Sequence, residues 1–565
     1  MHSTTSRRTF VKGLAAGGLL GGLGLWRTPV WAITSPGEPQ VLAGTDFDLF
    51  IGETPVNITG NPRTAITING GIPGPLLRWR EGDTVTLRVK NRLKENTSIH
   101  WHGILLPANM DGVPGLSFHG IEPGGVYVYT FQLRQNGTYW YHSHSGLQEQ
   151  SGVYGPLVID AKEPEPFQYD RDYVVMLTDW TDEDAASLMN TLKKQSDYYN
   201  YNKRTVGDFI HDVSEKGWAS TVADRKMWAE MKMNPTDLAD VSGATYTYLM
   251  NGQAPDSNWT GVFRPGEKLR LRFINGSAMT YFDVRIPGLK MTVVAADGLH
   301  VKPVSVDEFR IAVAETFDVI VEPTEAAYTL FAQSMDRTGF ARGTLAAKAG
   351  LSAPIPPLDP RPLVTMDDMG MGGMDHGSMA GMDHSAMAMP GMQSHPETEK
   401  DNPLVDMQAM TTAPKLDDPG LGLRNNGRRV LTYSDLRSTF EDPDGRDPSR
   451  TIELHLTGHM EKFAWSFNGV KFSDAEPLRL KYGERVRVVL VNDTMRTHPI
   501  HLHGMWSDLE DENGQFMVRK HTIDMPPGSR RSYRVTADAL GRWAYHCHLL
   551  YHMEMGMFRE VRVEE

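Results

Sequence analysis

The stretch GERVRVVLVN, residues 483–492, has close counterparts at two earlier places in the chain. GDTVTLRVKN begins at Gly82 and GEKLRLRFIN begins at Gly266. Each copy starts with glycine, continues with alternating apolar and polar residues, and ends in asparagine. This alternation predicts a half-buried strand that follows a turn. Because the copies lie about 200 residues apart, they indicate repeated domains and not a solenoid.

The sequence around each copy predicts an all-β fold of sandwich domains. Short alternating stretches such as VYVYTFQL and FDVIVEP are separated by turns rich in Gly and Pro, a pattern typical of β-sandwiches. We place the three domains at residues 45–165, 170–350 and 426–565. Residues 182–240 contain DEDAASLMNTLKKQ and VADRKMWAEMKM, which have helical periodicity. They are interpreted as a helical insertion in the second domain.

The composition excludes some classes of function. The chain has 565 residues and a formal net charge of −13, which argues against a nucleic-acid partner. Cys547 is the only cysteine, so the chain has no internal disulfide and the thiol is free for other chemistry.

The first 32 residues have the features of an export signal. TSRRTFVKG contains Arg7 and Arg8, an apolar Gly-rich stretch follows, and VWA ends at Ala32. This order is typical of a twin-arginine signal peptide. The alternative, a membrane anchor, is less favoured because the apolar stretch is short. We therefore expect a periplasmic mature chain without membrane insertion.

Histidine pairs occur at matching positions of the first and third copies only. Counted from the glycine of each copy, His100 in HWHG and His501 in HLHG occupy the same position, where the second copy has Val284. A second pair of matching segments, GTYWYHSH and GRWAYHCH, corresponds to AYTLFAQS in the second copy. The second domain is therefore predicted to lack metal ligands, which are replaced by Val284, Ile286, Ala332 and Ser334.

The spacing of these histidines points to copper. On a strand, residues i and i+2 point the same way, so a His-x-His pair can direct two imidazoles at one metal cluster. Cys547 points to the opposite side from His546 and His548. A thiolate with two histidines and an axial methionine forms a blue-copper site, and His498, His552 and Met557 can complete it. The remaining eight histidines suit a three-copper cluster between the first and third domains: His100, His102, His142, His144, His501, His503, His546 and His548. Structural zinc is disfavoured, because such sites usually contain pairs of cysteines.

All four motifs, and HCHLLYHMEMGMFREVRV in particular, resemble the copper signatures of multicopper oxidases. The export signal and the MDHGSM stretch are similar to those of the bacterial copper-resistance members. The resemblance implies three cupredoxin-like Greek-key domains and about four copper ions. It assigns the blue copper to His498, Cys547, His552 and Met557, and a lone copper to His100 and His501. It assigns the two paired coppers to His102, His142 and His546 on one side and to His144, His503 and His548 on the other.

The resemblance also implies the reaction. Electrons from Cu(I) or a phenol would reach the blue copper, cross from Cys547 to His546 and His548, and reduce O2 to water. Asp111 in NMDGVPG matches an acid that relays protons in the family, although an Asp before Gly is also a common turn residue. Met553 stands where some relatives have a second acid and is followed by Glu554, so the second proton donor is left open.

Residues 351–423 form a linker rich in Met and His, which we expect to be disordered without a ligand. Its centre reads MDHGSMAGMDHSAMAM. Thioethers prefer Cu(I), so accessory copper binding is predicted there, with a plain spacer as the alternative. The candidate ligands are Met374, His376, Met379, Met382, His384 and Met387. Met227, Met231 and Met233 have helical spacing, which favours core packing over a Cu(I) site near the blue copper. The histidines outside the motifs are expected to be ordinary polar or core residues: His119, His300, His455, His459 and His521.

Three functions are compatible with these features. The favoured one is a periplasmic oxidase that converts Cu(I) to Cu(II) in copper tolerance and also accepts phenols. The alternatives are a laccase-like phenol oxidase and a copper-sequestering protein whose oxidase centre matters little. Other periplasmic copper-handling proteins are candidate partners.

Overall fold

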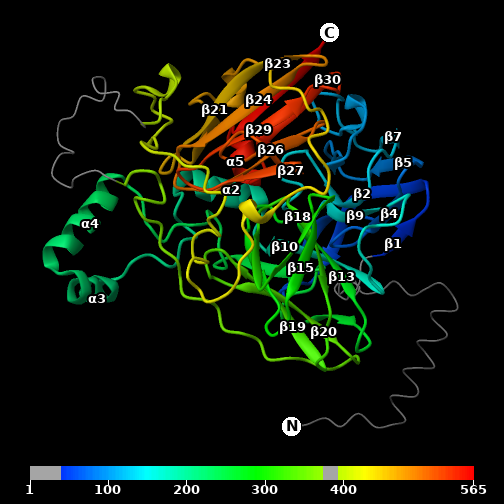
Figure 1. The fold of residues 1–565 in the computed structure, drawn as a ribbon, viewed down its shortest axis with the longest axis horizontal. Coiled ribbons are helices and arrows are strands. Elements are labelled where there is room, and N and C mark those ends of the chain that lie inside the picture. The colour runs from blue at the N-terminus through cyan, green and yellow to red at the C-terminus, as the bar shows by residue number, and fades with distance from the viewer. Residues whose placement is uncertain (1–39, 373–391) are drawn as a thin grey trace.

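The computed structural model describes residues 40–372 and 392–565. Three β-sandwiches follow one another along the chain and pack together (Figure 1). This confirms the predicted all-β architecture. The predicted signal peptide lies outside the described residues. Within the described ranges, no helix has both the length and the apolar character needed to cross a membrane.

The first sandwich contains a five-stranded sheet of order β1-β4-β9-β8-β6 and a four-stranded sheet of order β3-β2-β5-β7. Its elements are β1 (Val41–Ala43), β2 (Asp46–Val56), β3 (Arg63–Ile68), β4 (Leu76–Arg80), β5 (Thr84–Asn91), β6 (His100–His102), the 3-10 helix η1 (Ala108–Met110), β7 (Val126–Gln132), β8 (Gly137–His142) and β9 (Tyr154–Asp160).

The second sandwich contains sheets of order β11-β10-β13-β18-β15-β16 and β12-β20-β19-β14-β17. Its strands are β10 (Arg171–Thr181), β11 (Tyr246–Met250), β12 (Trp259–Val262), β13 (Leu269–Asn275), β14 (Phe282–Arg285), β15 (Met291–Ala296), β16 (Leu299–Val306), β17 (Glu308–Ile311), β18 (Thr316–Val321), β19 (Ala327–Ser334) and β20 (Phe340–Ala346). Three helices lie between β10 and β11: α2 (Ala185–Lys194), α3 (Val206–Lys216) and α4 (Trp218–Glu230).

The third sandwich contains sheets of order β22-β21-β24-β29-β26-β27 and β23-β31-β30-β25-β28. Its strands are β21 (Arg450–His459), β22 (Ala464–Phe467), β23 (Leu478–Lys481), β24 (Arg485–Asn492), β25 (His498–Leu502), β26 (Ser507–Glu510), β27 (Phe516–Lys520), β28 (Thr522–Met525), β29 (Arg530–Thr536), β30 (Gly541–Cys547) and β31 (Phe558–Glu564). The helix α5 (Leu550–Glu554) follows β30, and the 3-10 helices η2 (Glu397–Glu399), η3 (Tyr433–Asp435) and η4 (Phe472–Asp474) lie in the connections.

The three repeated stretches form the same strand of each sandwich. β5, β13 and β24 each lie inside a sheet, paired in parallel with β2, β10 and β21 respectively. On the other side each pairs antiparallel, with β7, β18 and β29. The sequence repeat therefore corresponds to a repeat of the sheet topology.

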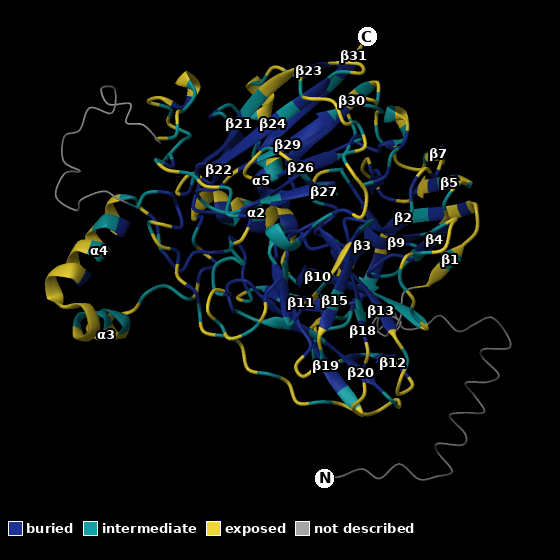
Figure 2. Cartoon of the chain, viewed as in Figure 1, coloured by how far each residue is buried: buried dark blue, intermediate teal, exposed yellow. Residues whose placement is uncertain are grey.

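The predicted half-burial of this strand is confirmed for β5. It is wrong for β24, where only Arg487 is partly exposed, and for β13, which is buried along its whole length (Figure 2). Its arginines at 270 and 272 are almost fully buried. Arg270 pairs with Asp318, and Arg272 donates to Asp318 and to Thr138 of β8. The polar positions of this strand are therefore covered by the first sandwich, and ion pairs compensate their burial.

The helical insertion packs through one face of its first helix and through Trp228 of α4, which is also buried in the core. Leu188 and Leu192 of α2 are buried, and the side chain of Asp184 accepts a hydrogen bond from the backbone N–H of Ser187. Such an N-cap satisfies one of the free amide groups at the start of a helix. α3 and α4 extend to one side of the molecule (Figure 1).

The prediction that the linker is disordered is wrong for its two flanks. Residues 351–372 and 392–423 lie along the second and third sandwiches, and Val364, Met369, Met407 and Leu416 are buried in the core. These few apolar side chains anchor the segment, and the backbone N–H of Val364 donates to the carbonyl of Pro235. The centre of the linker, with all six accessory candidates from Met374 to Met387, lies outside the described residues.

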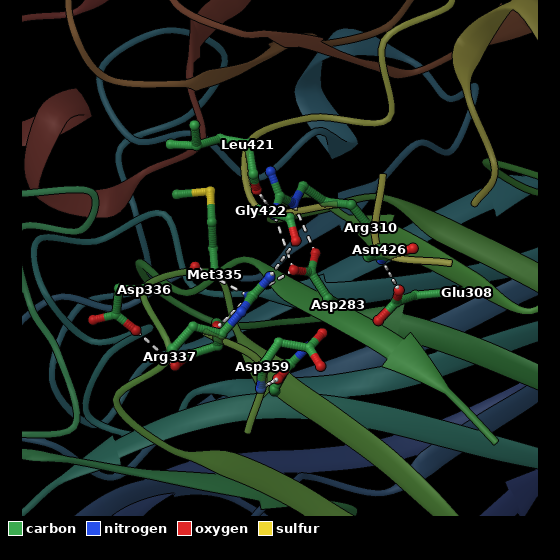
Figure 3. Close-up of polar contacts among 12 residues, drawn as sticks. Asp283, Glu308, Arg310, Met335, Asp336, Arg337, Asp359, Leu421, Gly422 and Asn426 are labelled. Atoms are coloured by element: carbon green, nitrogen blue, oxygen red, sulfur yellow. Dashed lines mark hydrogen bonds and ion pairs between the residues drawn. The ribbon is translucent and has the colours of Figure 1, made fainter. Parts of the chain in front are cut away.

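A buried polar network attaches the end of the linker to the second sandwich (Figure 3). Asp283 of β14 pairs with Arg310 and Arg337. Arg310 donates to the carbonyl of Leu421, and Arg337 donates to that of Gly422. Because Asp283 is fully buried, its two arginine partners are needed to compensate its desolvation.

Candidate metal centre

Strand pairing brings the histidines of the two motif pairs opposite each other. In the first sandwich His100 of β6 faces His142 of β8, and in the third His501 of β25 faces His546 of β30. The corresponding pair in the second sandwich is Val284 of β14 and Ala332 of β19. The three domains thus present the same pair of positions, and only the outer two carry imidazoles there.

The histidine-bearing strands of the first and third sandwiches face one another. The ring of His100 stacks on that of His503 with centroids 3.9 Å apart, and His102 stacks on His501 at 3.8 Å. The eight imidazoles predicted for the three-copper cluster therefore meet at the contact between two domains that are far apart in sequence.

The structure regroups the histidines assigned to the paired coppers. The Nε2 atom of His546 lies 3.3 Å from Nε2 of His144 and 3.0 Å from Nε2 of His503. On the other side, Nε2 of His548 lies 3.3 Å from Nε2 of His142. The ring of His548 is also 4.9 Å from that of His102. His546 and His548 thus occupy the reverse of the places that the resemblance gave them.

The second ring nitrogen of most of these histidines has a fixed partner. Nδ1 of His100 lies 2.7 Å from the carbonyl oxygen of Asp111, and Nδ1 of His503 lies 2.8 Å from the carboxylate of Asp111. Nδ1 of His501 contacts the carbonyl of His521 at 2.6 Å. Such contacts set the tautomer and aim the opposite nitrogen at the cluster.

Burial favours the neutral form of several imidazoles of the cluster. Burial is the main cause that lowers the pKa of His142, His144, His501 and His503 well below the usual range, and neighbouring imidazoles add to it. Burial also lowers the pKa of His546 to about 3. Neutral imidazole is the form that binds metals.

Several ring nitrogens at the centre of the histidine cluster have no hydrogen-bond partner. Their number and position show whether the residues present can hold copper. These nitrogens are Nε2 of His100, Nε2 of His501, Nδ1 of His102 and Nδ1 of His548. Buried polar atoms without partners are costly. For His100, His501 and His102, a metal ion among the rings would use the free lone pairs, so the residues present fit copper. Their donor atoms form compact groups, for example His100 with His501 and His503.

A separate site lies on the other side of Cys547. Its Sγ lies 3.5 Å from Nδ1 of His498 and 3.9 Å from Nδ1 of His552, and the two Nδ1 atoms are 3.1 Å apart. Met557 is fully buried, and its carbonyl accepts the backbone N–H of Cys547 at 3.1 Å. Burial raises the pKa of the thiol, so a cation is needed for the thiolate form. Two imidazoles and one sulfur at these distances fit a blue-copper site.

The outer nitrogens of both histidines at this site are also held. Nε2 of His498 contacts Oγ1 of Thr494 at 2.7 Å, and Nε2 of His552 contacts the carboxylate of Asp240 at 2.8 Å. The indole of Trp465 stacks on the His552 ring at 3.8 Å. These contacts leave the two Nδ1 atoms directed at Cys547.

Sequence reasoning missed three residues at these sites. Asp240 comes from the helical insertion of the second domain. Glu149 is buried with its carboxylate 2.7 Å from Nδ1 of His142. His521, which was expected to be an ordinary residue, lies with Nδ1 3.1 Å from Nε2 of His102. Glu149 could have been proposed from the sequence, because it closely follows the HSH motif. The contacts of Asp240 and His521 could not, because they depend on packing between domains.

The comparisons with known proteins agree with this geometry. Sequence models of the multicopper oxidase family match residues 51–164, 171–349 and 445–565, one match in each sandwich. The chain therefore belongs to the multicopper oxidase family and is an oxidoreductase, and the family implies copper as its cofactor. The copper-oxidase prediction is confirmed at this level.

Full-length relatives share a narrower name. A protein of Pseudomonas syringae pv. tomato, named copper resistance protein A homolog, is 79% identical over 100% of both chains. Copper resistance protein A of Escherichia coli is 73% identical over 99% of both chains. The fold is similar to that in the crystal structure of Fet3p, a multicopper oxidase that functions in iron import, with a TM-score of 0.65. The two sequences are 19% identical, and the match covers 93% of this chain and 91% of Fet3p. This last likeness confirms the cupredoxin-type fold.

Proposed function

We propose that this protein couples the one-electron oxidation of Cu(I), and of phenols, to the four-electron reduction of O2 to water. The observation that carries the proposal is the position of Cys547. It contributes its sulfur to one candidate site, while its neighbours in sequence, His546 and His548, contribute imidazoles to the other.

Copper bound by these residues would supply the one-electron storage and O2 chemistry that side chains alone lack. The peptide bonds of Cys547 are the shortest covalent connection between the two sites. About four ions would be held, one by His498, Cys547, His552 and Met557 and three among the eight imidazoles. The lone copper is placed at His100 and His501. The paired coppers are placed at His102, His142 and His548 and at His144, His503 and His546.

Asp111 is suited to move protons at the cluster. Its carboxylate contacts Nδ1 of His503, and Oδ1 has no hydrogen-bond partner. The residue is 1% exposed, so a proton on this free oxygen would be held close to the histidines and away from solvent. A positioned carboxyl group of this kind is suited to general acid catalysis.

A surface cavity of about 410 Å³ is suited to receive Cu(I). It is lined by Met233, Met460 and Asp237 among other residues. Arg496 pairs with both Asp237 and Asp240, and Asp240 contacts Nε2 of His552. Thioether sulfur prefers Cu(I). The lining also carries the carboxylates of Asp197 and Glu461, together with Lys194 and Lys232. Through Arg496 and Asp240, the lining residue Asp237 is therefore connected to His552, a ligand of the proposed blue copper.

A role in periplasmic copper tolerance is supported by the sequence. Residues 1–32 have the pattern of a twin-arginine signal, and the Met/His-rich stretch is suited to capture copper. The names of the full-length relatives point to copper resistance. Other periplasmic copper-handling proteins are proposed as partners.

Oxygen uptake by the copper-loaded protein tests the proposal. We expect uptake with Cu(I) at low micromolar substrate and a slower or less efficient reaction with a phenol. Efficient phenol turnover with no response to Cu(I) would favour a laccase-like role. Copper binding without oxygen uptake from either substrate would favour sequestration.

A further inference from the structure

A second group of metal-binding side chains, two histidines and two carboxylates, shares no residue with the two candidate copper sites described above. His395 and Glu399 belong to the chain that resumes after the Met/His-rich stretch, and Glu399 ends η2. His455 lies on β21, and Asp493 directly follows β24. The linker and the third sandwich thus each supply one imidazole and one carboxylate.

The polar atoms of these four side chains converge on one point. Nδ1 of His395 lies 3.3 Å from Oε2 of Glu399 and 3.3 Å from Oδ2 of Asp493. Nδ1 of His455 lies 2.6 Å from the same oxygen of Asp493 and 3.7 Å from Oε1 of Glu399. The two rings are 5.1 Å apart. Donor atoms bound about 2.0–2.2 Å from a single ion lie roughly 3 Å from one another, so these spacings suit a metal.

The outer nitrogen of each ring is occupied by an acceptor. Nε2 of His395 lies 3.1 Å from the carbonyl oxygen of Ala409, and Nε2 of His455 lies 3.3 Å from Oε1 of Glu453. A carbonyl accepts only from a protonated nitrogen, so Nε2 of His395 carries its hydrogen. The same orientation suits His455 beside Glu453. Both Nδ1 atoms then point inward, and that of His455 donates to Oδ2 of Asp493 at 2.6 Å in the metal-free protein. Loss of this proton would leave a lone pair for a metal, as in metal sites whose histidines are held by outer acceptors.

The group is buried and incompletely satisfied. Glu399, His455 and Asp493 are 3%, 1% and 0% exposed. Oε1 of Glu399 and Nδ1 of His395 have no hydrogen-bond partner. A buried carboxylate oxygen without a partner is costly.

We propose that His395, Glu399, His455 and Asp493 bind one Cu(II) ion, separate from the coppers of the oxidase. Two imidazoles and two carboxylates match the donors that divalent first-row metals take, and Cu(II) binds most strongly in that series. The ion would neutralise both carboxylates. It would also tie the chain after the Met/His-rich stretch to β21 and β24.

The proposed Cu(II) site lies at the base of the Met/His-rich stretch, which suggests what the site does. The backbone N–H of Gln393 donates to the carbonyl of Met410, and Met410 donates to Gly370. The two ends of the stretch 373–391 are therefore held side by side, and His395 follows one of them. An ion at this base would retain Cu(II) next to a segment whose thioethers are suited to Cu(I).

Copper counting on the full-length, copper-loaded protein tests this site. The protein is titrated with CuSO4, loosely bound copper is removed by gel filtration, and copper per chain is measured. We expect Glu399→Gln and His395→Ala each to hold one copper fewer than the wild type, with unchanged blue absorption and Cu(I) turnover. The Gln substitution keeps the shape of Glu399, so it reports on charge if the Ala variant folds poorly.

His300→Ala is the matched control, since His300 has similar side-chain exposure and also faces a carboxylate, that of Glu165. It should hold as much copper as the wild type. CuSO4 should also raise the Tm of the wild type more than that of Glu399→Gln. Equal copper counts in the wild type and Glu399→Gln would show an ion-paired histidine network and overturn the proposal. A site that takes Zn(II) in the presence of equal Cu(II) would also contradict it.

Discussion

Cys547 can serve two sites because successive side chains of a strand point to opposite faces. Its sulfur lies among His498 and His552, while His546 and His548 point to the interdomain cluster. Cys547→Ser should abolish the intense blue absorption and the oxidase activity, because a hydroxyl is a poor ligand for this copper. Absorption spectra and oxygen uptake measure both effects.

The same variant should keep its fold, since the thiol forms no disulfide. Circular dichroism and Tm close to those of the wild type are expected, and the interdomain cluster should still bind copper. A blue, active Cys547→Ser protein would show that the sulfur is not a ligand.

The role of thioether sulfur in the Cu(I) cavity can be tested by replacing Met233 and Met460. Exchange of both for leucine conserves volume and should cost less than about 1.5 kcal/mol at each position. Because it removes the soft sulfur, we expect the KM for Cu(I) to rise by roughly tenfold, about 1.4 kcal/mol. Phenol turnover should change little. Steady-state oxygen uptake with each substrate measures the difference.

Met291→Leu provides the control, because Met291 is buried in the second sandwich away from the cavity. Its Cu(I) kinetics should match the wild type. If the double variant loses Cu(I) and phenol turnover equally, the methionines support the fold and do not select the substrate.

At the scale of elements, β13 depends on ion pairs at a domain boundary. Arg270 is fully buried and contacts Glu165, which leads from the first sandwich into the second. Burial alone would raise the pKa of Glu165. The hydrogen bonds and charges of His300 and Arg270 outweigh this effect and lower the pKa to about 2. Since this folded-state value is below the unfolded value, the pair stabilises the fold above about pH 4.5.

Glu165→Gln should therefore lower the free energy of unfolding by roughly 1–3 kcal/mol at pH 7. As the pH falls from about 4.5 toward 2, the wild type loses the same contribution and the difference should shrink. Thermal unfolding across this pH range measures it. A difference that stays constant down to pH 2.5 would mean that the charge of Glu165 contributes nothing.

The Met/His-rich stretch can be tested without disturbing its docked flanks. Met369 is buried and Gly370 accepts hydrogen bonds from Met410 and Thr411, so a deletion that reached these residues would damage packing. We instead exchange the six candidate ligands from Met374 to Met387 for Ser or Gln. Cu(I) turnover at low copper should fall, because soft ligands are lost.

Blue absorption and phenol oxidation of this variant should stay at wild-type levels, which serves as its internal control. Fewer weakly bound coppers should also be measured. Unchanged copper binding and unchanged turnover at low Cu(I) would identify the stretch as a spacer.

The sequence predicts local strand features well and contacts across domains poorly. Alternation and equal spacing placed His100, His501 and Val284 at one position, and the strand pairing agrees. The assignment carried over from the family resemblance reversed His546 and His548, and side-chain alternation could not correct it, because alternation gives the face of a strand but not which partner lies across it. The burial of Arg270 depends on a neighbouring domain, which periodicity within one strand does not report.

At the scale of the whole molecule, the cluster exists only where two domains meet. His100 and His503 stack although they lie on opposite sandwiches, and the second sandwich separates their sequences. The second domain keeps the sheet topology without ligands and contributes Asp240 to the site of Cys547. Repeat copies identified the two outer domains as partners, but their mutual orientation, and hence Asp240 and His521, required the packed structure.

The most direct measurement of the central claim is anomalous X-ray diffraction from crystals of the copper-loaded protein at the copper edge. We expect one peak among His498, Cys547 and His552, and three peaks between the β6–β8 and β25–β30 strand pairs. No peak should lie between Val284 and Ala332. A copper there, or no copper between the first and third sandwiches, would contradict the account.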